Sequence, residues 1–264
     1  MNALKKVLIK SFKFFVVSNL YISLGVVSVY LYYSLKNEQS LKVIPLIFIF
    51  CSTYIAHHAL RYIPYKKNLP LSPMFKDFYL QHKLFFSSSI ALTSTFLFII
   101  LTTLDLHQWL FLSVATLIVV LYEAIIFSGF SLRHFPLFKP AFIGLAWSLL
   151  IFSFIKDFIF LDFIDCFVFI LLLSLPFDIK DLQEDIKNSI KTLPQLLGRY
   201  TTHFCIFSMG LYSLSALFTQ QQILFPIFSW LIYSLGIIYP PSNKLAYYAL
   251  FEGLLFLRPL FYLL

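Results

Sequence analysis

The sequence predicts an all-α membrane protein, built as one polytopic bundle of about nine transmembrane helices. The chain of 264 residues is 60% hydrophobic, and its mean hydropathy is +0.85. Only 12% of its residues are charged, which is about half the share found in a soluble domain. The apolar residues also gather in segments that approach the roughly 20 residues needed to cross a bilayer.

Short polar connections separate the apolar segments, and no shift in composition divides the chain. We therefore expect residues 1–264 to form a single domain. Turn-forming residues mark the connections most clearly at Asn37-Glu38, Pro64 to Pro73, Arg133 to Pro140 and Pro240 to Asn243. In chain order, the expected spans are Phe14–Tyr33, Val43–Leu60, Leu84–Thr103, Trp109–Phe127, Ala141–Ile155, Phe163–Phe177, Thr202–Phe218, Leu224–Ile238 and Ala246–Leu264.

Lysine and arginine residues accumulate on one side of this predicted bundle. When successive connections are assigned to alternate sides, 16 basic residues fall on the side of the N-terminus and 3 on the other. Basic connections stay in the cytoplasm, so we expect a multi-pass protein of the bacterial inner membrane with a cytoplasmic N-terminus. The basic residues flank apolar segments and form no arm or patch, which argues against a nucleic-acid partner.

The most informative motif is the run Asp178-Ile-Lys-Asp181-Leu-Gln-Glu-Asp185 at the end of the sixth expected span. Its spacings place the three aspartates on one face of a helix. Three carboxylates on one face repel one another unless a cation lies between them, and Mg²⁺ takes carboxylate, water and phosphate oxygens. The run therefore predicts a site for a magnesium-bound diphosphate. The alternative is a solvated loop that leads into an acidic helix start.

The segment from Leu175 to Arg199 resembles the second aspartate-rich motif of the UbiA superfamily of intramembrane prenyltransferases. After the acidic run, Lys191-Thr-Leu-Pro-Gln-Leu-Leu-Gly198 matches the family's K-T-L-P-x-x-x-G turn. The resemblance implies a nine-helix bundle in which Mg²⁺ ions hold a prenyl diphosphate between two acidic motifs. The diphosphate leaves, an allylic cation forms, and either a hydrophobic or aromatic acceptor captures it or the prenyl chain cyclises.

The same resemblance assigns roles to individual residues. It gives Asp178, Asp181 and Asp185 to magnesium binding and catalysis. Phe135-Pro-Leu-Phe-Lys139 is similar to the family's Y-x-x-x-K element with Phe for Tyr, so Lys139 is expected to contact the diphosphate as a catalytic residue. A loop lysine on the basic side is the alternative for Lys139. The remaining candidates for substrate binding are Arg61, His58, Lys180, Lys191 and Arg199.

The family's first motif, N-D-x-x-D-x-x-x-D after the second span, is absent. The chain has Ala56-His-His-Ala-Leu-Arg61 there, and the nearest acid is Asp77. We expect Arg61 to carry part of the charge that a metal would supply, because a guanidinium binds phosphate through two donors. An anchor at the end of a span is the alternative for Arg61, and packing at the end of a span is the alternative for His57 and His58.

The missing motif argues against a standard quinone or haem prenyltransferase and leaves two main functions open. The first is an enzyme that transfers or cyclises an isoprenoid, and the alternative is a non-catalytic UbiA-like protein that binds a lipid or a prenyl diphosphate. A transporter is a third possibility, but no internal repeat supports it. Elsewhere, we expect Asp162 and Asp165 to lie in an outer loop. Arg258 should pair with a residue other than Glu252, because six residues along a helix do not share a face.

Overall fold

The computed structural model describes residues 2–66, 73–123, 138–187, 191–219 and 223–263, and every regular element within them is helical. The all-α fold class is therefore confirmed for the described part of the chain. In chain order the elements are α1 (Asn2–Val17), α2 (Leu20–Lys36), α3 (Val43–Lys66), α4 (Pro73–Gln81), α5 (Lys83–Leu101), α6 (Leu106–Glu123), α7 (Phe138–Phe152), α8 (Phe160–Lys180), α9 (Leu182–Lys187), α10 (Leu193–Leu197), the 3-10 turn η2 (Gly198–Tyr200), α11 (Thr201–Thr219), α12 (Leu224–Ile238) and α13 (Lys244–Leu263).

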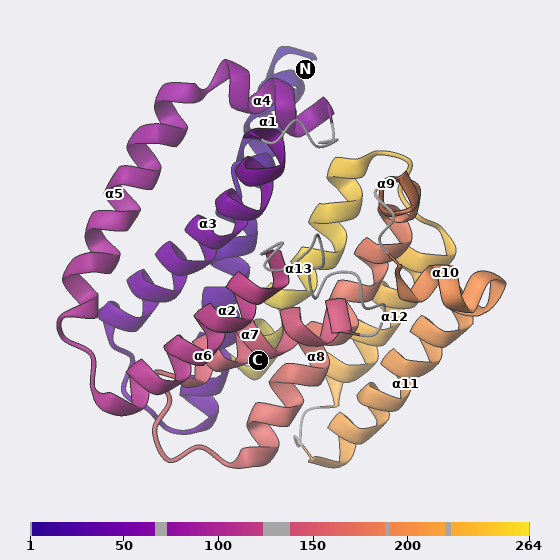
Figure 1. Ribbon diagram of the computed structural model, residues 1–264. Coiled ribbons are helices and arrows are strands. Elements are labelled where there is room, and N and C mark those ends of the chain that lie inside the picture. Colours follow the sequence, from indigo (N-terminus) through magenta and orange to yellow (C-terminus); the bar gives the residue numbers. More distant parts are fainter. Residues whose placement is uncertain (1, 67–72, 124–137, 188–190, 220–222, 264) are drawn as a thin grey trace.

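Most helices pack against the helices that neighbour them in the chain. One series runs from α6 through α7, α8, α11 and α12 to α13, and α13 then packs against α2, α2 against α3 and α3 against α5. Figure 1 shows α5 standing beside α3 at one edge of the molecule and α11 at the opposite edge. The core gathers around α8, whose side chains meet those of α7, α11 and α13.

The first expected span overlaps both α1 and α2, and each of the other eight overlaps one described helix, in chain order α3, α5, α6, α7, α8, α11, α12 and α13. By length and composition alone, Lys83–Leu101, Phe160–Lys180 and Leu193–Phe218 qualify as membrane spans. The bent pair Val7–Val17 and Leu20–Lys36 makes a fourth if it is one span. These apolar helices are consistent with a membrane protein, whereas the full set of nine spans stays a prediction.

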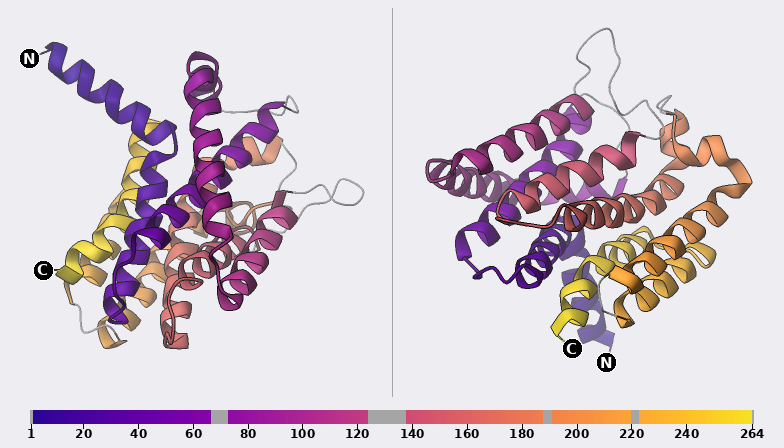
Figure 2. Two further views of the ribbon diagram at one scale, coloured as in Figure 1. Left: turned by 90° about the vertical axis from the view of Figure 1, so that its left-hand side faces the viewer. Right: turned by 90° about the horizontal axis from the view of Figure 1, so that it is seen from below.

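The prediction of one continuous helix over Phe14–Tyr33 is wrong. The chain breaks between α1 and α2, and the two helices meet at an angle of 66°. Asn19 lies at the break with a left-handed backbone, φ 64°, a conformation that asparagine tolerates better than most residues. As a result α1 leans away from the rest of the bundle (Figure 2).

The prediction that Asp162 and Asp165 are loop residues is also wrong, because both lie in the first two turns of α8, which begins at Phe160. Asp162 is buried in the first turn of α8 and accepts a bond from Lys36 Nζ at 2.6 Å. Asp165 pairs with the buried Arg258 of α13, which confirms that Arg258 finds a partner other than Glu252. The expected start at Phe163 follows Asp162 directly, so hydropathy placed the start of the helix one turn too late.

Candidate functional site

The acidic run lies where α8 ends and α9 begins. Pro176 inside α8 has no amide proton, and the Leu172 carbonyl instead accepts a hydrogen bond from the Tyr233 hydroxyl at 2.9 Å. The Tyr247 hydroxyl donates to the Pro176 carbonyl at 2.6 Å. Tyrosines of α12 and α13 thereby hold the last turns of α8 in place.

Helical hydrogen bonding continues through the junction between α8 and α9. The Asp181 amide donates to the Phe177 carbonyl at 2.8 Å, and the Asp185 amide donates to the Asp181 carbonyl at 2.9 Å. Asp178 and Asp185 are buried, and Asp181 between them is half-buried. The expected helical progression of the three aspartates is therefore present, although the helix assignment is interrupted at Asp181.

Lys139, the second residue of α7, brings two of these acids together. Its Nζ atom lies 2.7 Å from Asp178 Oδ1 and 3.0 Å from Asp185 Oδ2. Lys139, Asp178 and Asp185 are 6%, 2% and 1% exposed, and we call these three residues the Lys139 cluster. Buried charges require paired partners, and here two carboxylates from α8 and α9 converge on one cation from α7.

A glycine brings α7 close enough to α8 for this contact. A Cβ atom at Gly144 would lie 2.9 Å from the Phe167 carbonyl oxygen and 3.2 Å from the Leu171 nitrogen. Any larger residue would therefore press on the backbone of α8, which cannot give way as a flexible side chain does. The close approach of the two helices sets the reach of Lys139 toward Asp178.

The number of carboxylates in the Lys139 cluster bears on the magnesium site that the sequence predicts. Mg²⁺ usually takes one or two protein carboxylates and completes its shell with water and phosphate oxygens. Asp178 and Asp185 already direct one oxygen each to a common point. No group of three or more His, Cys, Asp or Glu side chains among the described residues has an arrangement suited to a metal ion, so joint binding by Asp178, Asp181 and Asp185 stays a prediction.

The other basic candidates, Lys180, Lys191 and Arg199, each lie in different surroundings. Lys180 is half-buried, with its Nζ atom 5.1 Å from the centre of the Tyr247 ring. Lys191 is exposed ahead of α10. Arg199 is exposed in η2, where it stacks on Tyr200 and donates to its hydroxyl at 2.8 Å. None of the ion pairs described for the Lys139 cluster includes these three residues.

His58 lies inside the protein and its ring belongs to a different environment from the Lys139 cluster. Its Nδ1 atom is 2.8 Å from the Tyr79 hydroxyl of α4, and its ring packs against Tyr54 and Phe86. Arg61 belongs to α3, but its side chain lies outside the described part, as does the segment from Phe135 to Leu137. Their expected roles therefore stay predictions.

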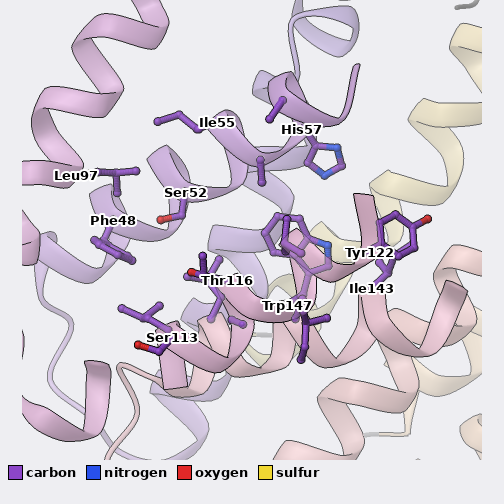
Figure 3. A pocket seen from close by; sticks show the side chains of 18 of the residues that line it. Phe48, Ser52, Ile55, His57, Leu97, Ser113, Thr116, Tyr122, Ile143 and Trp147 are labelled. Carbon is purple, nitrogen blue, oxygen red and sulfur yellow. The ribbon is translucent and has the colours of Figure 1, made fainter. Parts of the chain in front are cut away.

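A pocket of about 880 Å³ opens between α3, α5, α6 and α7. Its wall is mostly aliphatic and aromatic, and Figure 3 shows side chains from all four helices directed into it. This volume lies within the range of small-molecule sites, about 300–1,000 Å³. The polar or amphipathic residues in its described lining are Ser52, His57, Trp109, Ser113, Thr116, Tyr122 and Trp147.

His57, which the sequence did not single out from His58, lines this pocket. Its ring stacks on Trp147 of α7 at a centroid distance of 5.5 Å and an interplanar angle of 11°. Neighbouring residues of a helix point about 100° apart, because each turn holds 3.6 residues. His57 points away from the α3 face formed by Phe48, Ser52 and Ile55, so helical periodicity could not have identified it as a pocket residue.

The Lys139 cluster and the pocket share one end of α7. Phe142 and Ile143, which line the pocket, follow Lys139 by three and four residues and so lie one helical turn from it on the same face. An ionic cluster thus stands next to one end of a long apolar cavity. No protein-family model, curated protein or solved structure matches this chain.

Proposed function

We propose that the chain is a UbiA-like intramembrane enzyme that acts on an isoprenoid diphosphate with Mg²⁺. The observation that carries the proposal is the buried Lys139 cluster, placed one helical turn from an apolar pocket of about 880 Å³. A molecule with a charged head and a long apolar tail suits this combination. The resemblance of residues 175–199 to the second aspartate-rich motif supplies the reaction class.

The head of the substrate would bind at the junction of α8 and α9. Asp178 and Asp185 would hold the magnesium ion, with Asp181 at the rim, and Mg²⁺ would neutralise the charge of the departing diphosphate. Lys139 is already placed between the acids and would bond the diphosphate oxygens from the end of α7. Arg61, Lys180, Lys191 and Arg199 remain candidates for further contacts to the phosphates, and His58 for a supporting position.

The tail of the substrate would occupy the pocket between α3, α5, α6 and α7. Its walls carry Trp147, Phe142 and Tyr122 among aliphatic residues. Aromatic faces attract cations, by roughly 0.5–2 kcal/mol for each ring. Such a wall would stabilise the allylic cation and keep water away from it, whether an acceptor captures the cation or the chain cyclises.

The proposal places the protein in a membrane with nine spans and a cytoplasmic N-terminus, as in the bacterial inner membrane. Soluble magnesium and diphosphates are then available at the acidic run. Labelling of single cysteines at Ser242 and Glu38 tests this topology. The account requires position 242 to react from the cytoplasm and position 38 from outside the cell, and the reverse result would contradict it.

A binding protein without catalysis is the second candidate, because an ammonium already occupies the point on which Asp178 and Asp185 converge. Incubation of the purified protein with geranyl, farnesyl and geranylgeranyl diphosphates and Mg²⁺ separates the two. The proposal requires released diphosphate and a new lipid product.

Asp178→Asn should abolish diphosphate release and product formation. Asp77→Asn in α4, which changes an exposed acid, serves as the matched control. Binding without release would establish the second candidate, and absence of binding would reject both.

A further inference from the structure

The reaction proposed above must release one proton, whichever product it makes. The C–O bond breaks and its electron pair leaves with the diphosphate. If an acceptor captures the allylic cation, a new bond forms and the acceptor loses a proton. If the prenyl chain cyclises or eliminates, a carbon next to the cation loses a proton and the C–H pair becomes a double bond. Either route needs a base within reach of the cation.

The described lining of the pocket contains one imidazole, that of His57. A neutral imidazole is the commonest general base in enzymes. The rest of the described lining is apolar or carries Ser, Thr, Tyr and Trp groups, which are not bases at neutral pH. Asp178 and Asp185 are absent from that lining and hold Lys139 instead.

The position of His57 suits proton transfer. Figure 3 shows His57 with Tyr122 at one end of the pocket, whereas Leu97 and Ser113 lie toward the other end. Ile143 lines the pocket one turn from Lys139 on α7, and Trp147 stands one turn further on. The stacking of His57 on Trp147 fixes the plane of the imidazole ring. An indole face also attracts an imidazolium, so Trp147 would stabilise the ring once it has taken the proton.

We propose that His57 is the proton acceptor of the reaction, with Trp147 as its positioning residue. The inference rests on the proposed function and adds to it a catalytic group that lies outside the acidic run. A ring nitrogen of neutral His57 takes the proton, either from the acceptor or from the carbon next to the cation. The imidazolium then loses this proton to solvent after the product leaves.

The test uses membranes that contain the full chain, incubated with radiolabelled geranylgeranyl diphosphate and Mg²⁺, with lipid products separated and counted. His57→Gln keeps a polar side chain but removes the base. Its binding of geranylgeranyl diphosphate should stay within about twofold of wild type. Formation of the wild-type lipid product should fall roughly 100- to 10,000-fold, the usual contribution of general base catalysis. Water capture should raise the share of geranylgeraniol among the remaining products.

The pH profile provides a readout that a merely structural role would not change. Wild-type activity should fall at acidic pH, because a protonated imidazole cannot accept a proton. This acidic limb should disappear in His57→Gln. His107→Gln is the matched control, since His107 of α6 packs against Phe111 and is absent from the described lining. Its rate and pH profile should match wild type.

The outcomes separate the two proposals. If wild-type membranes neither bind geranylgeranyl diphosphate nor form product, the proposed function fails and the role of His57 fails with it. If wild type is active and His57→Gln keeps its rate, product and pH profile, only the role of His57 is overturned. If His57→Gln loses diphosphate binding, the same measurements are made on His57→Asn. Loss of binding in both variants would show that His57 supports the pocket structure and would also overturn its catalytic role.

Discussion

Two buried ionic clusters stand near the two ends of α8, and they differ in charge. Near its start, Arg258 pairs with Asp165, which also accepts bonds from Tyr33 at 2.6 Å and Tyr212 at 3.0 Å. We call these four residues the Arg258 cluster. Near its end, the Lys139 cluster joins one ammonium to two carboxylates. The acids of α8 in the two clusters are about 20 Å apart along the helix.

The surroundings of the two cations differ as well. The Arg258 guanidinium is fully buried and lies 4.6–5.4 Å from the ring centres of Tyr32, Tyr33, Phe169 and Phe225. It carries one positive charge against one negative charge. The three residues of the Lys139 cluster carry one positive charge against two negative charges, and their cluster adjoins a pocket. A balanced cluster enclosed by rings suits a structural role, whereas an acidic cluster beside a cavity suits a ligand.

The largest expected effect is on stability, in the Arg258 cluster. Arg258→Met should lower the free energy of unfolding by about 3 kcal/mol, because it leaves the half-buried Asp165 carboxylate without its cation. The double variant Arg258→Met, Asp165→Leu should recover most of this loss. Denaturant unfolding in detergent measures both, with the exposed Arg199→Met as control. A loss below 1 kcal/mol in Arg258→Met would contradict the structural role of the Arg258 cluster.

Lys139→Met should give a similar loss, roughly 3 kcal/mol, and a different response to Mg²⁺. Without the ammonium, two buried carboxylates face each other, so a divalent cation should bind there and restore stability. Titration with MgCl₂ should therefore raise the Tm of Lys139→Met more than that of wild type or Arg258→Met. If Mg²⁺ has no greater effect on this variant, the Lys139 cluster is a second structural cluster and the contrast disappears.

A third variant separates binding from stability. Asp181→Asn should weaken the Mg²⁺-dependent binding of geranylgeranyl diphosphate about 10- to 100-fold, which is roughly 1.4–2.7 kcal/mol. Asp181 is half-buried at the junction of α8 and α9, so its neutralisation should hardly change the Tm. Equilibrium binding in detergent at fixed salt measures the affinity. Unchanged affinity would mean that Asp181 belongs to a solvated turn.

The connection between α5 and α6 supplies the smallest effect and a baseline for the others. The Gln108 amide donates to Asp105 at 2.9 Å, and Lys156 lies 3.0 Å away. These contacts hold the pKa of Asp105 below its ordinary value. The charged form therefore stabilises the fold at neutral pH, and this contribution is lost as the pH falls through the lowered pKa. Because 41% of the Asp105 side chain is exposed, solvent screens this contribution. Asp105→Asn should therefore lower the Tm at pH 7 only slightly in a thermal scan, and a clear drop would contradict this assignment.

Hydropathy could place the helices because burial in a membrane requires long apolar segments, and each expected span overlaps a helix. It could not foresee the bend at Asn19, since a single residue in a left-handed conformation changes no apolar pattern. It also missed α4, which is held by contacts such as the ring packing of Phe78 on Phe14. Long-range packing determines both features.

The candidate site was predictable in part. The spacing of the acidic run and its resemblance to a known motif drew attention to Asp178, Asp185 and Lys139, and the structure brings these three residues together. Their mutual pairing was not predictable, because it depends on the close approach of α7 and α8 at Gly144. The sequence analysis named His58 rather than His57 as a substrate-binding candidate, whereas the structure places His57 in the pocket lining and His58 against Tyr79.

The most direct test of the central claim is the Mg²⁺ dependence of prenyl diphosphate binding at the Lys139 cluster. Purified wild-type protein should bind geranylgeranyl diphosphate in the presence of MgCl₂ and lose most of this affinity in EDTA. Asp178→Asn should bind weakly under both conditions, while Asp77→Asn should match wild type. The account is contradicted if wild type binds equally well with and without Mg²⁺, or if Asp178→Asn retains the full magnesium response.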